Sequence, residues 1–190
     1  MNVVGQEGEH LETTVVGQSV ERLDAIKKVT GTAVFADDIQ FSRPLYAQVV
    51  RSPHAHANIL SIDLTAAQSL PGVRSVITGE CYKKRAGLYL EDKNFIAVGK
   101  ARYRGEPVAA VAADSPEIAR RACELVKVEY EVLPAVTDAL EGMKPDAPII
   151  HPDLGSYKVL PIFYPQPGTN ISHHYVLRKG DADNAFAEAG

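Results

Sequence analysis

The sequence predicts an α+β fold in which helices pack on a mixed sheet. Segments with strand-like and helix-like patterns are intermixed along the chain, without the regular crossover rhythm of a doubly wound nucleotide-binding fold. None of the 14 glycines stands in a Gly-x-Gly pair, so the dinucleotide-binding fingerprint is absent. Of the 190 residues, 45% are hydrophobic and 23% are charged, which is enough for an apolar core without a disulfide or metal.

The first half of the compact region predicts two strands, a short helix and a third strand. These elements cover Leu45 to Arg51, Asn58 to Leu64, Thr65 to Ser69 and Val73 to Thr78. A Pro71-Gly72 turn precedes the third strand. Further upstream, the run from Thr32 to Ala36 is also strand-like.

The second half predicts a strand, a helix and a strand. Pro107 to Ala113 is an unbroken run of Val and Ala residues, typical of a buried strand whose small side chains let a helix approach closely. Ser115-Pro116-Glu117 combines a cap residue, a first-turn proline and an early acid, and predicts a helix that ends near Leu125. Val126 to Val132 alternates apolar and charged residues, as in a strand with one packed face.

The proline distribution predicts the domain organisation. Seven of the 12 prolines lie between residues 134 and 167, which favours turns and extended connections there. We therefore expect a flexible N-terminal tail over residues 1–16, a folded domain over residues 17–140 and a Pro-rich linker over residues 141–178.

The composition excludes several classes of protein. The net charge of −4 gives no basic footprint for nucleic acid, and two short basic clusters, at Lys83 to Arg85 and Arg102 to Arg104, are expected to be solvated surface. No apolar run reaches the ~20 residues that a membrane span needs. The N-terminus shows no secretory signal pattern, so we expect a cytoplasmic location.

Few residues suggest catalysis or metal binding, and each has a structural interpretation beside it. His54 and His56 could point two imidazoles at one metal ion, but a turn for His54 and a strand-fixing hydrogen bond for His56 are favoured. His173-His174 could bind a metal adventitiously. In Asp37-Asp38 the like charges could raise the pKa of one carboxyl group and create an acid, although a turn with hydrogen bonds from side chain to backbone is favoured.

The two cysteines give no disulfide framework and no metal-binding pair of pairs. Cys123 falls on the inner face of the predicted helix and is expected to be a small buried apolar residue. Cys81 lies near Lys83 and Lys84, whose charges could activate its thiol, but a structural or incidental thiol is favoured.

The segment from Gly79 to Asn94 is the remaining functional candidate. It has no consistent period and contains the exposed-looking triplet Leu88-Tyr89-Leu90, so a long loop is predicted. Long ordered loops often contact ligands or partners. The alternative is that Leu88 and Leu90 anchor the loop on the core.

Five motifs occur in order between residues 17 and 140. They are Arg22-x-Asp24-x-x-x-Lys28-Val29-Thr30-Gly31-x-Ala33-x-Phe35-x-x-Asp38, Ser52-Pro53-His54-Ala55-His56-Ala57-x-Ile59-x-x-Ile62-Asp63, Pro71-Gly72-Val73, Arg102-Tyr103-x-Gly105-Glu106-Pro107-Val108-Ala109-x-Val111-Ala112 and Val128-x-Tyr130-Glu131-x-Leu133-Pro134. Together they closely resemble the opening of the molybdenum-binding subunit in the family of xanthine dehydrogenase, aldehyde oxidase and aerobic carbon monoxide dehydrogenase. Residues 179–190 resemble the start of that family's next domain.

The resemblance implies an α/β-hammerhead fold for residues 17–140 and a structural or interface role within a molybdenum hydroxylase. Such an enzyme hydroxylates N-heterocycles or aldehydes with water. The resemblance places molybdopterin-molybdenum in the full subunit, and iron-sulfur clusters and usually FAD in partner domains or subunits. It implies no catalytic residue, cofactor ligand or metal ligand in this chain, so the isolated chain is expected to be an inactive fragment.

Two finer expectations follow from the resemblance. Residues 179–190 would begin the downstream molybdopterin-binding domain, and Leu88 would lie near the substrate channel. The alternative function, suggested by the loop over residues 79–94, is a free-standing hammerhead module that binds a partner or small ligand.

Overall fold

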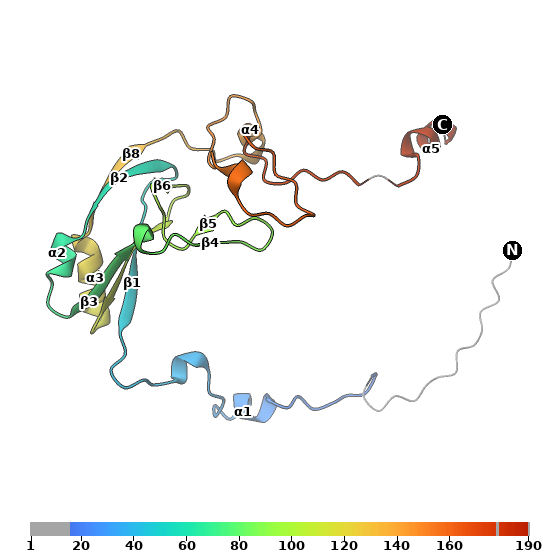
Figure 1. The fold of residues 1–190 in the computed structure, drawn as a ribbon. Coiled ribbons are helices and arrows are strands. Elements are labelled where there is room, and N and C mark those ends of the chain that lie inside the picture. Colours follow the sequence, from blue (N-terminus) through green and yellow to red (C-terminus); the bar gives the residue numbers. More distant parts are fainter. Residues whose placement is uncertain (1–15, 178, 190) are drawn as a thin grey trace. The chain divides into compact units, whose positions relative to one another are not determined.

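The computed structural model describes residues 16–177 and 179–189 (Figure 1). The chain forms two compact units, which are divided between Ser42 and Arg43. Nearly all of the predicted N-terminal tail lies outside the described residues.

The N-terminal unit contains two short helices, α1 (Ala25–Val29) and the 3-10 helix η1 (Ala36–Asp38). The prediction of a strand-like run from Thr32 to Ala36 is wrong. The amides of Thr32 and Ala33 both donate to the carbonyl of Lys27 at 2.9 Å. The first residues of this run therefore form the turn that ends α1. The Asp38 carboxylate then accepts a hydrogen bond from the amide of Phe35 at 2.8 Å, which confirms the turn expected at Asp37-Asp38.

The second unit contains two three-stranded antiparallel sheets. The first sheet has the strand order β1 (Tyr46–Arg51), β7 (Pro107–Ala113), β3 (Val73–Thr78). The second sheet has the strand order β6 (Lys100–Ala101), β2 (Ala57–Asp63), β8 (Lys127–Val132). A two-stranded hairpin adds β4 (Arg85–Ala86) and β5 (Lys93–Asn94). The long strands lie close to their predicted bounds, and the α+β class is confirmed.

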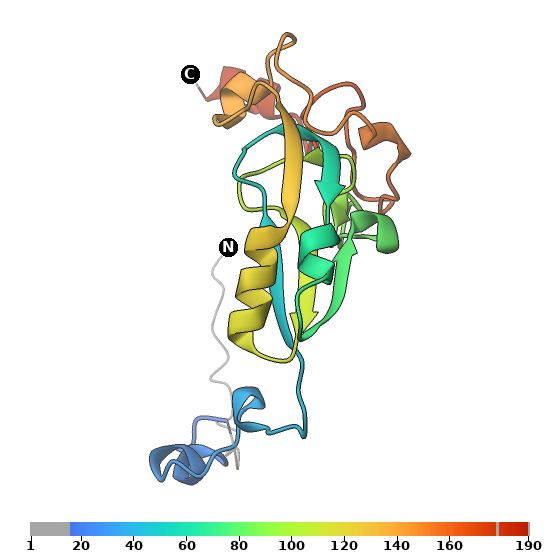
Figure 2. The same cartoon turned by 90° about the vertical axis from the view of Figure 1, so that its left-hand side faces the viewer.

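Two helices cover the first sheet, α2 (Thr65–Gln68) and α3 (Pro116–Leu125), and they lie side by side in Figure 2. The buried face of α3 carries Ala119 and Ala122, which pack toward the alanine-rich central strand β7. Small side chains on both surfaces permit this close approach. The main apolar cluster consists of Ala67, Ala109, Val111, Ala122 and Val126.

The start of α3 depends on Ser115, as the sequence predicts. The Ser115 hydroxyl accepts a hydrogen bond from the amide of Ile118 at 3.2 Å, and Pro116 occupies the first turn. The turn before β3 brings Gly72 close to the same helix. With φ at +88°, a Cβ at Gly72 would lie 2.7 Å from Cδ1 of Ile118, so glycine is required there.

Replacing Ser115 with alanine should lower the free energy of unfolding by about 1 kcal/mol, because an amide of α3 loses its acceptor. Urea denaturation measures the change. Ser115→Asp restores an acceptor and should recover most of the loss. An equal loss in both variants would show that the cap does not cause the effect.

The C-terminal part of the second unit contains short helices joined by turns. These are α4 (Ala139–Gly142), η3 (Leu154–Ser156) and α5 (Ala182–Glu188). Within the predicted linker, Leu154 and Tyr157 are buried against Leu90, so this segment carries its own small apolar cluster. Among the described residues, no helix has the length and apolar character needed to cross a membrane.

Candidate functional site

Two of the sequence motifs meet at a buried polar junction. Ser52 and Glu106, its two polar side chains, are 2% and 4% exposed. His56, four residues after Ser52, is also buried, at 3% exposed. The Ser52 amide donates to the Glu106 carbonyl at 2.9 Å, and the Gly105 amide donates to the Ser52 carbonyl at 2.8 Å. Arg51 adds a guanidinium hydrogen bond to the Gly105 carbonyl at 2.8 Å. The junction therefore joins the ends of β1 and β7, which the sequence separates widely.

His56 fixes the strand that follows it, as predicted. Its Nδ1 lies 2.7 Å from the Pro134 carbonyl and must carry the proton, because a carbonyl oxygen only accepts. The His56 carbonyl also accepts from the Leu133 amide at 2.9 Å. His54 instead sits in the predicted turn and meets the Tyr130 ring edge-on, with centroids 5.1 Å apart. The two imidazoles thus make separate contacts.

Glu106 is a buried carboxyl group that closes a tight loop. Its Oε2 accepts a hydrogen bond from the Arg102 amide at 2.5 Å. Burial raises the pKa of Glu106 above its ordinary value of 4.5, while the amides of Arg102 and Tyr103 and the Arg102 charge oppose the rise. The carboxyl group consequently holds the backbone of Arg102 in place.

This raised pKa predicts a pH dependence of stability. Between 4.5 and its folded-state pKa, Glu106 binds more protons in the folded chain than in the unfolded chain, so its contribution to stability falls as pH rises. Glu106→Gln removes this titration. The unfolding free energy of the variant, relative to the native chain, should therefore increase as pH rises from 4.5 and then level off.

Urea denaturation across this pH range measures the effect, and Glu117→Gln is the control. The pKa of Glu117 is lowered by hydrogen bonds at the start of α3, so the stability of that variant relative to the native chain should fall as pH rises toward 4.5 and should change little above 4.5. A pH-independent difference for Glu106→Gln would contradict the prediction.

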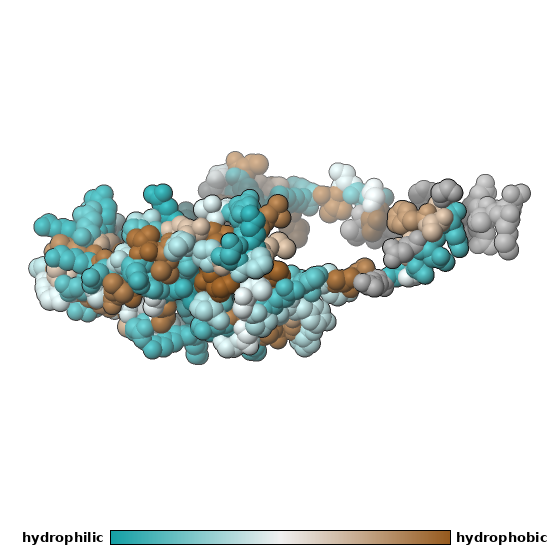
Figure 3. Space-filling view, turned by 90° about the horizontal axis from the view of Figure 1, so that it is seen from above, coloured by the Kyte–Doolittle hydropathy of each residue, from teal (hydrophilic) through white to brown (hydrophobic). Residues whose placement is uncertain are grey.

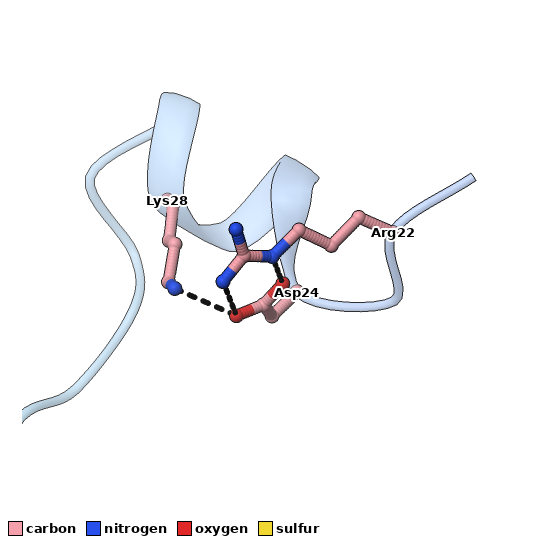
Figure 4. A network of polar contacts seen from close by, with 3 residues as sticks. All are labelled: Arg22, Asp24 and Lys28. Carbon is pink, nitrogen blue, oxygen red and sulfur yellow. Dashed lines mark hydrogen bonds and ion pairs between the residues drawn. The ribbon is translucent and has the colours of Figure 1, made fainter. Parts of the chain in front are cut away.

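The first sequence motif forms a surface ion-pair network (Figure 4). The Asp24 carboxylate is bound by the Arg22 guanidinium and, at 2.7 Å, by Lys28 Nζ. The hydrogen bond from Arg22, followed by that from Lys28, lowers the pKa of Asp24. All three side chains are exposed, so the network orients α1 rather than adding much stability.

The predicted loop from Gly79 to Asn94 contains short regular elements. It opens with the 3-10 helix η2 (Gly79–Cys81) and then forms the β4-β5 hairpin. Gly87 directly follows β4, and an added Cβ there would be only 1.8 Å from the Leu90 carbonyl oxygen. The loop is therefore ordered by close backbone packing, which the sequence pattern does not reveal.

Leu88 and Leu90 lie in different environments. Leu90 is 7% exposed, pairs with Val159 in an isolated bridge and packs on Leu154 and Tyr157. Leu88 is 77% exposed. The anchoring interpretation is thus confirmed for Leu90 but not for Leu88, whose side chain stands free of the core.

Aromatic rings from three segments gather beside this loop, an arrangement that the sequence analysis missed. Tyr89 stacks toward Phe163 with centroids 5.8 Å apart, and Phe163 stacks on His173 at 4.3 Å. Tyr164 and Tyr175 lie nearly parallel to the His173 ring. His173 Nδ1 accepts a hydrogen bond from the Tyr164 amide at 2.9 Å, so this ring orders the turn.

The other candidate residues make ordinary structural contacts. His174 Nδ1 lies 2.8 Å from the Gln166 side-chain amide nitrogen. Cys81 is an exposed free thiol, and Cys123 is half-buried with its pKa raised by burial and by the nearby Glu124. No group of three or more His, Cys, Asp and Glu side chains that could hold a metal ion occurs in the described part of the chain.

A polar cavity of about 480 Å³ lies between the hairpin and the chain around η3. Its charged lining consists of Lys83, Arg85, Arg102 and Lys158 with Glu91 and Asp153. Arg85 is exposed, in agreement with the interpretation of its cluster as solvated surface, whereas Arg102 is half-buried and departs from it. Arg85 lies over the Tyr157 ring at 4.6 Å, and half-buried Arg102 is held by the loop that Glu106 closes.

Residues 30–134 match the family model described as "Aldehyde oxidase and xanthine dehydrogenase, a/b hammerhead domain". The chain is 37% identical over 188 residues to the gamma subunit of the 6-hydroxypseudooxynicotine dehydrogenase complex of Paenarthrobacter nicotinovorans, covering 92% of this chain and 22% of that protein. It is 34% identical over 176 residues to the nicotinate dehydrogenase large molybdopterin subunit of Eubacterium barkeri, covering 92% of this chain and 38% of that subunit.

Solved structures agree with this assignment. A Cu,Mo-CO dehydrogenase chain matches 72% of this chain with a TM-score of 0.67 and 35% identity, and the match covers 18% of that chain. The chain thus spans well under half the length of these relatives. The fold and the motif series predicted from the sequence are confirmed. The chain belongs to the aldehyde oxidase and xanthine dehydrogenase family and contains its α/β-hammerhead domain.

Proposed function

We propose that the chain serves as the structural and interface domain of a molybdenum hydroxylase that hydroxylates N-heterocycles or aldehydes with water. The observation that carries the proposal is the match to the hammerhead domain. The chain corresponds to only 22% and 38% of two relatives, so most of each relative has no counterpart in this chain. The buried polar side chains support a structural role, since Ser52, His56 and Glu106 are used in internal hydrogen bonds.

Exposed apolar side chains support the interface role. Leu60 and Val132, on neighbouring strands of the second sheet, are 58% and 63% exposed. Figure 3 shows hydrophobic side chains interspersed with hydrophilic ones on the visible face. In the proposal these side chains contact the partners, which are a downstream molybdopterin-binding domain and iron-sulfur and flavin subunits or domains.

The described residues do not form a donor set for a metal centre, so no step of the hydroxylation is assigned to them. In the proposal, other parts of the subunit hold molybdopterin-molybdenum, and partner domains or subunits hold iron-sulfur clusters and FAD. Nicotinate dehydrogenase, a relative at 34% identity, has a subunit named for molybdopterin, which supports this division.

The proposal also assigns the parts of the chain. Residues 17–140 form the hammerhead domain, residues 141–178 connect it onward, and residues 179–190 begin the next domain, where the Asp181 carboxylate accepts from the Asn184 amide at 3.1 Å and caps α5. Leu88 is assigned to the wall of the substrate channel, because it is exposed on a loop that Leu90 fixes. The free thiols Cys81 and Cys123 support a cytoplasmic location.

The purified chain tests the proposal. Metal analysis should find no stoichiometric molybdenum, and mixtures with hypoxanthine or an aldehyde should not reduce a dye acceptor. In a second arm, this chain replaces the matching segment of the Eubacterium barkeri subunit, and the chimaera should still assemble and load molybdenum. Turnover by the isolated chain would overturn the proposal, and failure of a folded chimaera to assemble would favour a free-standing binding module.

A further inference from the structure

We infer that the polar cavity between the β4-β5 hairpin and η3 is a binding site for a phosphate-type oxyanion, free or carried on a small organic molecule. Four cationic and two acidic side chains line the cavity, and Lys83 is paired with Glu80 at 2.6 Å, so these seven groups together carry about one net positive charge at neutral pH. Its volume of about 480 Å³ is within the usual range for small-molecule sites. This inference stands independently of the proposed function.

Arg102 supplies the strongest argument. Its Nη1 donates to the Lys100 carbonyl at 3.3 Å, whereas its buried Nε has no hydrogen-bond partner among the described residues. A buried charged donor without an acceptor is costly, and an oxyanion in the adjoining cavity would supply the acceptor. No carboxylate of the described chain forms an ion pair with Arg102 within 4.0 Å, although the Glu106 carboxyl group lies close enough for the two charges to interact.

The acidic side chains of the cavity are already matched to cations. Glu91 is paired with Lys158 at 2.8 Å, and Asp153 lies 3.6 Å from the Arg85 guanidinium. The Arg85 guanidinium carbon also lies 4.6 Å from the centroid of the Tyr157 ring, a contact that helps to fix its position. The pairing removes the repulsion that free carboxylates would exert on an oxyanion.

The walls of the cavity are held in place before any ligand binds. Glu106 fixes the backbone of Arg102, and the Leu90 bridge to Val159 joins the hairpin to the opposite wall. The nearby His151 bonds to the Tyr157 hydroxyl at 3.0 Å, and its pKa is lowered first by burial and then by the charge of Arg102. Asp92 and Asp153 act on this pKa in the opposite direction, so charges of both signs lie near the site.

Isothermal titration of the full 190-residue chain with inorganic phosphate and, separately, with glycerol phosphate tests the inference, at ionic strength held constant with sodium chloride. Saturable binding of either compound is expected. Arg85→Gln and Arg102→Lys should each weaken it by about tenfold, because each removes a fork of guanidinium donors. Tighter binding of the ester would indicate an organic phosphate as the ligand, and equal binding would indicate free phosphate.

Arg121→Gln is the matched control, because Arg121 is exposed on α3 and does not line the cavity. It should change the affinity by less than about twofold. Far-UV circular dichroism checks the folding of each variant, and Arg85→Gln carries the test if Arg102→Lys does not fold. Absence of saturable binding, or equal weakening by the Arg121 variant, would overturn the inference.

Discussion

Replacing Val111 with alanine is expected to lower the free energy of unfolding by about 2 to 3 kcal/mol. Val111 is 1% exposed and lies on β7, the central strand of the first sheet, where it joins Ala67 and Ala122 in the main apolar cluster. The substitution removes two methyl groups and leaves a void. The neighbouring alanines Ala67, Ala109 and Ala122 cannot extend into the void, so part of it is expected to remain.

Urea denaturation of the Val111→Ala variant measures this loss, and Val132→Ala is its matched control. Val132 also lies in a strand, β8, but is 63% exposed, so the same change should cost less than about 0.5 kcal/mol. Similar losses at both positions would mean that the first sheet and its helices do not form the stabilising core.

Replacing Gly87 with alanine is expected to remodel the loop that carries Leu88. The new Cβ would lie 1.8 Å from the oxygen and 2.6 Å from the carbon of the Leu90 carbonyl, distances at which backbone atoms must move. The backbone between Gly87 and Leu90 must therefore move apart, and the bridge from Leu90 to Val159 should be lost. We expect the local free energy of opening to fall by about 1 to 3 kcal/mol.

Hydrogen exchange reports this change at two amides. Glu91 donates to the Lys158 carbonyl at 2.9 Å and Leu160 donates to the Tyr89 carbonyl at 3.0 Å, so both should lose protection. Leu88→Ala is the control, because that side chain is exposed and its removal should leave both amides protected. Unchanged exchange in the Gly87 variant would show that the loop has another conformation.

The sequence predicts an element correctly where the secondary structure that its local pattern favours is also the one that the surrounding fold stabilises. The Val and Ala run of β7 is buried as expected, and Ser115 caps α3. The run from Thr32 to Ala36 has strand-like composition. Its first two backbone amides, however, donate hydrogen bonds to the carbonyl of Lys27, and this prevents them from pairing with another strand. A local pattern cannot show that a nearby carbonyl competes for the same amides.

The candidate site was harder to predict, because residues distant in sequence form it. Glu106 belongs to a recognised motif, yet its burial depends on Ser52 and the end of β1. Arg85 and Arg102 look like surface charges in sequence, and only the fold brings them to one cavity. The order of the motifs does predict the family, because a series of motifs can be compared with a family even when the contacts between them are unknown.

The central position of β7 has a consequence for synthesis of the chain. Both of its neighbours, β1 and β3, precede it in sequence, and they pair with it rather than with each other. A nascent chain that has emerged only as far as β3 therefore carries strands without their partner, and the sheet can close only after Ala113 is available. Folding on the ribosome is consequently governed by long-range pairing, and a pause before β7 would prolong the exposure of two edges to aggregation.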